Sequence, residues 1–446
     1  MAVEAKAVTA GAPAQAQEFE ASQAYRSYVV WFLFVVYTFN FVDRQILSIL
    51  GEDVKREFGL SDSQLGLLTG FAFAAFYTTL GIPIARWADK GNRVTIISIS
   101  LVVWSAFTAV TGFAKNFYHL LAARLLVGIG EAGCSPAAHS IISDYFDSKT
   151  RSRALSIYSM GVYGGTFLGL LIGGQVAHRY GWRSAFFLVG VPGILLALVL
   201  KMTIREPPRG FADRVVPKEP PPFLGVLKKL IVKPTFRHLS LASGLHAFVS
   251  YGVSAFYGPY LIRSHGFNKA EAGTWLAFIV GIGGLLGTYL GGTYADKLAQ
   301  RHNDSRYLLK VPAISNLIAL PFCAIAFWSP DPTIALICIF FYISFGTMYL
   351  APSISATYRL VSGRERALAS ASLFLVLNFI GIGTGPWLTG KISDTLKEYY
   401  VSSGATIAQA TADGLRYALV IIAFTFAWST YHYFRANRTL REEEEK

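Results

Sequence analysis

Long apolar runs alternate with short polar breaks along most of the 446-residue chain. A helix that crosses a bilayer needs about 20 mostly apolar residues, because each residue advances about 1.5 Å through roughly 30 Å of hydrocarbon. Six such runs precede one long polar break, and six follow it. The predicted spans are 28–50, 64–86, 94–113, 117–140, 153–176, 184–204, 238–262, 272–295, 309–328, 333–358, 367–390 and 413–434. The pattern predicts an all-α membrane protein with twelve transmembrane helices.

The long break, residues 205–237, is rich in proline and basic residues. Proline-rich segments act as semi-rigid spacers, and the apolar and basic pattern over 223–233 predicts a short amphipathic surface helix. The first 27 residues are alanine-rich and polar, without the basic start and short apolar core of a secretory signal. We therefore expect a disordered cytoplasmic tail at 1–27, a six-helix bundle at 28–204, a linker at 205–237, a second six-helix bundle at 238–434 and a cytoplasmic tail at 435–446.

Basic residues are concentrated in every second loop. Lys and Arg cluster after spans two, four, eight and ten and in the long break, whereas the loop between spans nine and ten has neither. Loops rich in Lys and Arg stay on the cytoplasmic side of a membrane. The distribution predicts a multi-pass protein of the cell membrane with both termini in the cytoplasm.

The composition agrees with a membrane protein. Hydrophobic residues make up 53% of the chain and charged residues 15%, where a soluble domain carries about 25% charged residues. The net charge of +13 sits in short clusters between apolar runs, which does not favour a nucleic-acid partner. Cys134, Cys323 and Cys338 lie in apolar stretches without metal-like spacing, so we interpret them as small buried hydrophobic residues.

Two short motifs recur at equivalent places in the two halves. An Asp-Lys pair ends the second and eighth spans, at 89–90 and 296–297, and an Arg-x-Arg-Ala-Leu motif precedes the fifth and eleventh, at 151–155 and 364–368. The copies are 207 and 213 residues apart, which indicates an internal duplication. Duplicated halves are typical of secondary transporters, in which one half rocks against the other around a central site.

Charged residues at the predicted cytoplasmic helix ends are candidates for a gate. The set comprises Asp89, Lys90, Arg93, Asp144, Arg151, Arg153 and Asp296. Acidic side chains can cap a neighbouring helix and basic ones can pair with acids opposite, so we interpret the set as a latch formed in one conformation. The alternative, solvated charge that only sets topology, explains the basic residues but not the repeated aspartate.

Glycines recur every fourth residue in two spans. They are Gly161, Gly165, Gly169 and Gly173 in span five, and Gly283, Gly287 and Gly291 in span eight. Small residues at this spacing let another helix backbone approach closely. The contact could be a sliding surface that gates a cavity or static packing, and both interpretations stay open.

Four ionisable residues fall inside the predicted spans of the first half: Asp43, Arg44, Arg124 and Glu131. Such a residue costs several kcal/mol near the bilayer centre and is a functional hypothesis by default. The apolar parts of spans seven to twelve contain almost none. Charge in the membrane is therefore expected mainly in the first half.

Helical geometry limits how these four residues can meet. Arg124 and Glu131 are seven residues apart, which places them within about 20° of one face, whereas Asp43 and Arg44 diverge by about 100°. We expect Asp43 or Glu131 to pair with an arginine from the other helix. Asn40, one turn earlier, can hydrogen-bond to either member of the first pair.

The chemistry of these residues indicates proton coupling and anion binding. A carboxylate balanced between desolvation and a nearby arginine can take up and release a proton, so Asp43 and Glu131 are the proton-coupling candidates. Arginine suits phosphate or carboxylate, so Arg44 and Arg124 are candidates for substrate binding. The alternative is an ion-pair network that only joins two spans.

Further cavity-lining candidates are Asn40, Tyr251, Tyr257, Asn378 and Trp387, while His246 is interpreted as a packing residue.

No motif indicates an enzyme. Neither a Walker-type element nor a metal-ligand cluster is evident. A channel would need a polar stripe in both halves, which the charge-poor second half argues against. We expect a transporter with no cofactor, driven by a proton gradient.

The chain resembles the major facilitator superfamily. Residues 85–93 resemble its loop motif between spans two and three, residues 124–132 its proton-transfer motif, and span five its glycine-rich antiporter motif. The resemblance implies the major facilitator fold, with twelve transmembrane helices in two pseudo-symmetric six-helix bundles.

Within that superfamily the chain resembles the Spinster family, in a bacterial form. The resemblance rests on Asn40-Phe-Val-Asp43-Arg44 and on residues 128–138, 144–146 and 151–156. It implies transport of lysophospholipids or sphingosine-1-phosphate across a bacterial inner membrane, with Asp43, Arg44, Arg124 and Glu131 as substrate and proton residues. The phosphate head would lie on the first half and the acyl chain against the second, among membrane lipids, in a monomer. The alternative is a proton-coupled organic-anion symporter or a drug exporter of the same fold.

Overall fold

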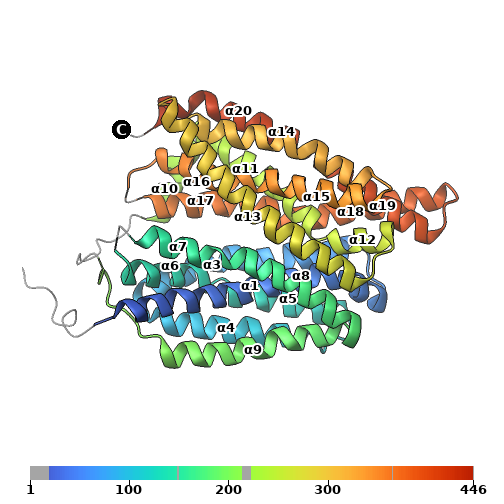
Figure 1. Ribbon diagram of the computed structural model, residues 1–446, viewed down its shortest axis with the longest axis horizontal. Helices are drawn as coiled ribbons and strands as arrows, with labels where there is room; N and C mark the ends of the chain where they lie inside the picture. The colour runs from blue at the N-terminus through green and yellow to red at the C-terminus, as the bar shows by residue number, and fades with distance from the viewer. Residues whose placement is uncertain (1–19, 148–149, 213–221, 364, 445–446) are drawn as a thin grey trace, which may run out of the picture.

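A computed structural model describes residues 20–147, 150–212, 222–363 and 365–444. The side chains of residues 82, 85, 86, 89 and 90 lie outside the described part. Over the described residues the chain forms helices and connecting loops without a strand. The helices run roughly along the long axis of the molecule in two halves, α1–α9 and α11–α20 (Figure 1). We name the end where α1 begins and α20 ends the termini end, and the opposite end the far end.

The first half contains six membrane-spanning units. They are α1 (Gln23–Phe58); η2 (Leu67–Phe71) with α3 (Ala72–Lys90); α4 (Arg93–Thr111); α5 (Phe117–Glu131) with α6 (Cys134–Tyr145); α7 (Arg151–Ser159) with α8 (Gly161–Tyr180); and α9 (Trp182–Thr203). A short helix at the far end, α2 (Asp62–Gly66), leads into η2. Helix α10 (Phe223–Val232) follows the linker and matches the amphipathic helix predicted over 223–233.

The second half repeats this arrangement. Its units are α11 (Pro234–Ser254) with α12 (Tyr257–His265); α13 (Lys269–Arg301); α14 (Tyr307–Trp328); α15 (Pro332–Gly346) with η3 (Thr347–Tyr349) and α16 (Leu350–Arg359); α17 (Arg366–Asn378) with η4 (Phe379–Thr384) and α18 (Gly385–Ser402); and α19 (Ile407–Ala423) with α20 (Thr425–Glu443). Among the described residues, ten stretches are long and apolar enough to cross a membrane, and α11 with α12, bent by 48°, makes an eleventh. With η2–α3, these units correspond to the twelve predicted spans and confirm the all-α membrane fold.

Local sequence signals place the ends of several helices. Ser61 forms a capping box with Gln64 at the start of α2, and Asn268 forms one with Glu271 at the start of α13; each box satisfies backbone N–H groups that the helix leaves free. Gly59 ends α1 with a φ of 64°, a left-handed conformation that glycine adopts without a Cβ clash. These caps make the sharp turns at the far end.

Several helices extend beyond the predicted spans. Helix α1 begins at Gln23 and α20 continues to Glu443, so much of the segment predicted as a C-terminal tail is helical. The extension of α20 follows from packing, because Tyr433, Ala436 and Leu440 are fully buried against the second half. The hydropathy pattern identifies the part of a helix in hydrocarbon and not the turns that continue on protein contacts. Residues 1–19 of the predicted N-terminal tail lie outside the described residues.

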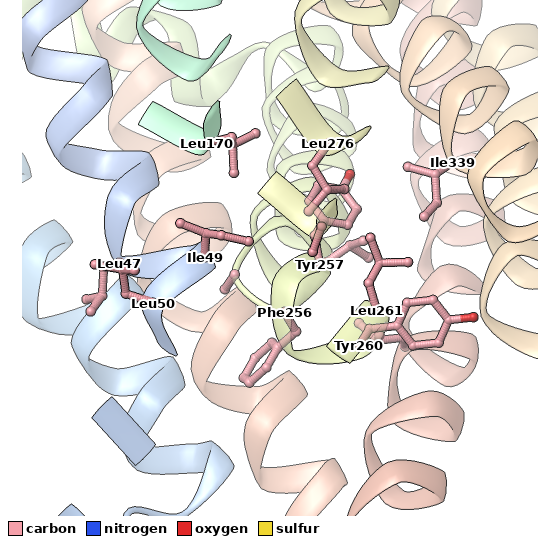
Figure 2. Packing of buried hydrophobic residues seen from close by; sticks show 14 of the residues in the cluster. Leu47, Ile49, Leu50, Leu170, Phe256, Tyr257, Tyr260, Leu261, Leu276 and Ile339 are labelled. Carbon is pink, nitrogen blue, oxygen red and sulfur yellow. The ribbon is translucent and has the colours of Figure 1, made fainter. Parts of the chain in front are cut away.

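The hydrophobic cluster that both halves share most widely lies at the far end. One cluster there takes Leu47, Ile49, Leu50 and Leu170 from the first half and Phe256, Tyr257, Tyr260, Leu261, Leu276 and Ile339 from the second (Figure 2). Toward the termini end the core divides into one cluster of mainly first-half residues and one of second-half residues. The halves are therefore packed together at the far end, and their cores are separate at the termini end.

The two predicted glycine stripes pack within their own halves. A Cβ on Gly165 would come within 2.3 Å of the Thr38 carbonyl oxygen on α1, and one on Gly287 within 1.9 Å of the Ser344 carbonyl oxygen on α15. Glycines outside the stripes allow close approach between the halves: a Cβ on Gly174 of α8, for example, would come within 2.6 Å of the Lys269 carbonyl oxygen. In this conformation the stripes therefore pack helices within each half, and other glycines lie at the contact between the halves.

Candidate functional site

Helices α1 and α5 bring the four charged residues of the first half together. The Arg44 Nε donates to Glu131 Oε2 at 2.6 Å, and Arg124 Nη1 lies 3.7 Å from Asp43 Oδ1. Each acid thus pairs with an arginine on the other helix, which confirms the predicted cross-helix pairing. We call Asp43, Arg44, Arg124 and Glu131 the central cluster.

Three members of the central cluster are almost fully enclosed. Asp43 and Glu131 are each 1% exposed and Arg124 is 2% exposed, whereas the Arg44 side chain retains 14% of its accessibility. Burying charges is costly unless they are paired, and Arg44 is the most accessible member of the cluster.

Aromatic rings surround the Arg44 guanidinium. Its Cζ lies 4.9 Å from the ring centroid of Phe41 and 4.6 Å from those of Phe73 and Tyr77, within the range of cation–π attraction. Tyr251, on α11 of the second half, packs against the hydrophobic cluster to which Phe73 and Tyr77 belong. The accessible charge therefore lies where aromatic side chains from both halves meet.

Several buried polar atoms of the central cluster have no hydrogen-bond partner within the described protein. They are both carboxylate oxygens of Asp43, Glu131 Oε1, Arg124 Nε and Nη1, and the Oδ1 of neighbouring Asn40. An unsatisfied buried polar atom costs about 1–3 kcal/mol, and such atoms are rare. The cluster therefore has capacity for a proton, water or a ligand.

The charges of the central cluster balance when all four groups are ionised. Two carboxylates and two guanidinium groups give a net charge of zero, and uptake of one proton by either acid leaves a net charge of +1. Arginine does not lose its proton in a protein. The cluster can therefore change charge only through its carboxylates, and that change alters its affinity for an anion.

The remaining predicted substrate residues occupy different environments. Tyr251 is half-buried beside the rings around Arg44, but Tyr257 is 5% exposed and lies in the far-end core near Leu276 (Figure 2). Asn378 is half-buried at the end of α17, and Trp387 is 41% exposed on α18. Tyr251 is thus the second-half residue that the structure brings to the central cluster.

His246 is a packing residue, as its sequence context indicates. Its Nδ1 lies 2.8 Å from the Asn316 Oδ1, its Nε2 lies 3.1 Å from the Ser250 hydroxyl, and its ring stacks on Tyr349 at 3.7 Å. Both ring nitrogens are satisfied within the second half. The three cysteines are likewise free and buried, as predicted.

At the termini end, Arg93 fastens the linker to the first half. It donates to Glu206 at 2.6 Å, to Ser140 at 2.9 Å and to the Pro207 carbonyl at 2.7 Å, and it also pairs with Asp144. The predicted Arg93 and Asp144 therefore do meet, but in the described part of the chain their contacts stay within the first half and the start of the linker.

The remaining predicted gate residues lie at several positions around the termini end. Arg151 donates to the carbonyls of Ser143 and Phe146 near the end of α6, Arg153 is exposed, and the side chains of Asp89 and Lys90 lie outside the described part. Asp296 is exposed on the second half and lines a cavity of about 550 Å³ together with Arg359, Arg366 and Arg441.

A polar interface between the halves at the far end has no counterpart among the residues predicted from the sequence. Asp62 of α2 accepts two hydrogen bonds from Arg263 of α12, both at 2.9 Å, and further ones from Lys55 and from Ser393 of α18. Arg263 also donates to Glu52 at 2.7 Å. We call this group the far-end network.

A second carboxylate, this time from the second half, extends the far-end network. Asp394 of α18 accepts hydrogen bonds from the backbone N–H groups of Asp62 and Ser63 at 2.9 and 2.8 Å, so it caps the first turn of α2 from the other half. Lys269 and Asp53 form another inter-half pair at 2.7 Å. The partners are 201 to 332 residues apart, and the only signal in the sequence is the run of charges that ends α1.

Electrostatics keeps Asp62 ionised. Burial alone would raise the pKa of Asp62, but the adjacent Arg263 and Lys55 hold that pKa below its usual range. The carboxylate therefore stays charged and the network stays intact at neutral and mildly acidic pH.

Two pseudo-symmetric helical halves around a buried charge cluster, joined at one end, define a secondary transporter of the major facilitator type. The Major Facilitator Superfamily profile matches residues 33–386, and the chain belongs to that superfamily. It is a multi-pass membrane transporter and not an enzyme.

Within the superfamily the chain is of the Spinster type. A crystal structure of a bacterial homologue of the human lysosomal transporter Spinster, inward-facing and unoccupied, superposes with a TM-score of 0.88 at 35% identity and covers 96% of this chain and 100% of that one. Protein spinster homolog 1 of Xenopus laevis is 28% identical over 415 residues, 89% of this chain and 77% of that protein. An MFS-type efflux pump of Mycolicibacterium smegmatis is 34% identical over 367 residues, 82% of this chain and 84% of that protein.

Proposed function

We propose that the protein is a proton-coupled transporter that moves an amphiphilic, phosphate-bearing lipid, of the lysophospholipid or sphingosine-1-phosphate kind, by alternating access. The observation that carries this proposal is the central cluster, in which paired charges are buried with unsatisfied polar atoms and one arginine stays accessible. A network that only joined two helices would need neither feature.

Coupling follows from the charge balance of the cluster. When Glu131 is ionised it holds Arg44 in a 2.6 Å pair, and that pair competes with any anion for the guanidinium. Protonation of Glu131 removes the competitor and leaves a net positive charge. Proton uptake therefore favours anion binding, and proton release expels the anion, which is the reciprocity that linked binding requires.

The surroundings of Arg44 favour an amphiphile over a small anion. The guanidinium can bind a phosphate through two hydrogen bonds, while Phe41, Phe73, Tyr77 and Tyr251 offer apolar surface beside it. Each buried methylene contributes about 0.8 kcal/mol. The charge-poor second half is the expected surface for an acyl chain.

The packing of the two halves supports alternating access. The far-end network and one shared hydrophobic cluster hold the halves together at the far end, while their cores are separate at the termini end. The positive-inside rule places the termini in the cytoplasm, in this proposal that of a bacterial inner membrane. The central cluster would then be reached from the cytoplasm in this conformation, in a transporter that works as a monomer.

The second candidate function is export of a drug-like compound, which the similarity to the M. smegmatis efflux pump favours. A cationic or neutral drug would not need Arg44 as a ligand and would bind mainly through the aromatic rings. A small organic anion would use Arg44 but leave the apolar surface without a role. The three substrate classes therefore differ in which part of the site they need.

Transport by purified protein in proteoliposomes tests the proposal. The panel comprises a labelled lysophospholipid, labelled sphingosine-1-phosphate, a small dicarboxylate and a cationic dye, each with and without an imposed pH gradient. We expect gradient-dependent transport of the phosphate-bearing lipids and no more than background for the others. Transport of the dye alone would establish the drug exporter, transport of the dicarboxylate alone would establish the anion symporter, and transport that ignores the gradient would overturn proton coupling.

A further inference from the structure

A small basic cavity lies between α11 and α20 at the termini end. It measures about 250 Å³ and is lined by Pro234, His238, Arg435, Arg438 and Thr439. None of these described lining residues is acidic. The cavity is separate from the central cluster and from the larger cavity beside Asp296, whose lining includes three acidic residues.

Hydrogen bonds between α11 and α20 fix the walls of this cavity. The Nδ1 atoms of His238 and His432 lie 2.8 Å apart, and the hydroxyls of Thr235 and Thr439 lie 2.6 Å apart. The carboxylate of Glu443 accepts a hydrogen bond from the Thr235 backbone N–H. The two helices are held together without any contribution from Arg435 or Arg438.

Arg435 and Arg438 are uncompensated. Both side chains are exposed, and among the described residues neither forms an ion pair. They are three residues apart on one helix face, where like charges repel. Two lysines of the same end are engaged: Lys229 pairs with Glu365, and Lys233 donates to the carbonyls of Leu360 and Glu443. Two adjacent arginines without a counterion favour an anionic partner.

The position of the cavity along α20 indicates the level of the lipid headgroups. Trp428 and Tyr431 are 58% and 54% exposed on the same helix, and exposed Trp and Tyr residues concentrate at the membrane–water interface. Arg435 follows Trp428 by seven residues, about 10 Å along the helix axis. The arginines therefore lie just beyond the aromatic residues, where phosphodiester groups of a bilayer leaflet are found.

We propose that this cavity binds the phosphate headgroup of an anionic phospholipid from the leaflet at the termini end. Arg435 and Arg438 pair with the phosphate, His238 and Thr439 line the rest of the headgroup site, and the acyl chains follow the exposed apolar side chains of α20 into the bilayer. The bound lipid is a resident ligand on the outside of the second half, distinct from any transported molecule.

Native mass spectrometry of the full-length protein in detergent, titrated with phosphatidylglycerol or phosphatidylcholine, tests this site. We expect a phosphatidylglycerol adduct to form preferentially and its half-saturating concentration to rise about tenfold or more in Arg435→Gln/Arg438→Gln, since each basic residue near an anionic surface contributes about a fivefold gain. The matched control, Lys297→Gln/Arg301→Gln, removes two exposed charges at the same end of the same half and should bind like the wild type. The charge-retaining Arg435→Lys/Arg438→Lys variant should keep most of the binding.

Three outcomes would overturn the site. Equal losses in the test and control variants would mean that only overall surface charge matters. Equal binding of phosphatidylcholine would mean that the anionic headgroup is not recognised. Full competition by inorganic phosphate at a concentration similar to that of the lipid would assign the cavity to a soluble anion. The thermal unfolding midpoint of each variant without lipid, expected within a few degrees of the wild type, verifies that each is folded.

Discussion

Two groups of buried charges, both built partly on α1, differ in how completely the protein satisfies them. In the far-end network, Asp62 accepts from Arg263, Lys55 and Ser393, and none of these residues retains an unsatisfied buried side-chain atom in the described part of the chain. In the central cluster, Asp43, Glu131 and Arg124 all retain such atoms. The far-end network therefore satisfies its own polar atoms, whereas the central cluster does not.

This difference indicates a structural role for the far-end network and a chemical role for the central cluster. Removing one partner of a buried ion pair costs about 3–5 kcal/mol, and moving a two-state equilibrium from 1:99 to 99:1 takes about 5.5 kcal/mol. The loss of one partner from the far-end network would therefore change the equilibrium by an energy close to that of a full population shift. The central cluster would act by changing its charge, which biases the same equilibrium when a proton or substrate binds.

The largest effect is expected from Arg263→Gln, which leaves Asp62 and Glu52 without their arginine. The closed far end should lose about 3–5 kcal/mol and open in most molecules. Pulsed electron paramagnetic resonance between labels at positions 118 and 407, both exposed at the far end, would show the longer distance after the buried cysteines are replaced by alanine. Arg183→Gln is the control, because its pair with Glu57 is more than a third exposed and is worth at most about 1 kcal/mol. An unchanged distance in Arg263→Gln would contradict the structural role of the network.

Gly66→Ala should open the same interface by a steric route. A Cβ on Gly66 would lie 2.1 Å from the Pro386 carbonyl oxygen and 2.9 Å from the Trp387 Cα, and backbone atoms cannot rotate away. Overpacking of this kind costs about 1–3 kcal/mol, so a partial shift to the longer distance is expected with the same labels. Gly164→Ala, whose new Cβ would be 3.5 Å from its nearest neighbour, should leave the distance unchanged. A shift in both variants would indicate a general loss of helix packing.

Glu131→Gln tests the central cluster directly. The amide cannot exchange a proton, so uptake driven by a pH gradient should fall about tenfold, equivalent to about 1.4 kcal/mol, while exchange without a gradient persists. Proteoliposome transport with and without the gradient measures both quantities. Glu57→Gln makes the same chemical change in an exposed pair and should transport like the wild type. Persistence of full gradient dependence in Glu131→Gln would remove Glu131 from the coupling mechanism.

The smallest effect on the far-end distance is expected when the pH of the solution is lowered. Because the folded pKa of Asp62 is held below its usual value, its stabilising contribution is present above the unfolded value of about 3.9 and is lost only as the pH falls through the lower folded pKa. The distance between labels at 118 and 407 should therefore stay the same from pH 7.5 to pH 4.5. Opening within that range would show that another titrating group controls the interface.

The sequence predicted much of the central cluster because its signal is local. Ionisable residues in apolar runs are visible in one dimension, and helical geometry indicated that Asp43 and Glu131 would pair with arginines across α1 and α5. It could not distinguish Tyr251, which lies near Arg44, from Tyr257, which packs in the far-end core. Both tyrosines occur in the same predicted span, and the break between α11 and α12 separates their environments.

The far-end network could not be predicted for a related reason. Asp62 and Arg263 stand near helix ends, and Asp394 follows the last residue of the predicted span 367–390, so each lies where charge is ordinary and usually solvated. Their pairing depends on which ends of the two halves meet, and a hydropathy pattern carries no information about that contact. The same limit applies to the glycine stripes, whose spacing indicated close packing but not that the partners would be α1 and α15.

The sequence by itself determined that this protein lies in a lipid bilayer, the number and order of its spans, the duplication, and the concentration of buried charge in its first half. These follow from the thickness of hydrocarbon and the cost of charge within it, which act on each segment separately. Only the tertiary structure decided which charges are satisfied and which remain open to a ligand. Satisfaction depends on atoms that come within 3 Å of one another from segments hundreds of residues apart, and the packing of whole helices sets those distances.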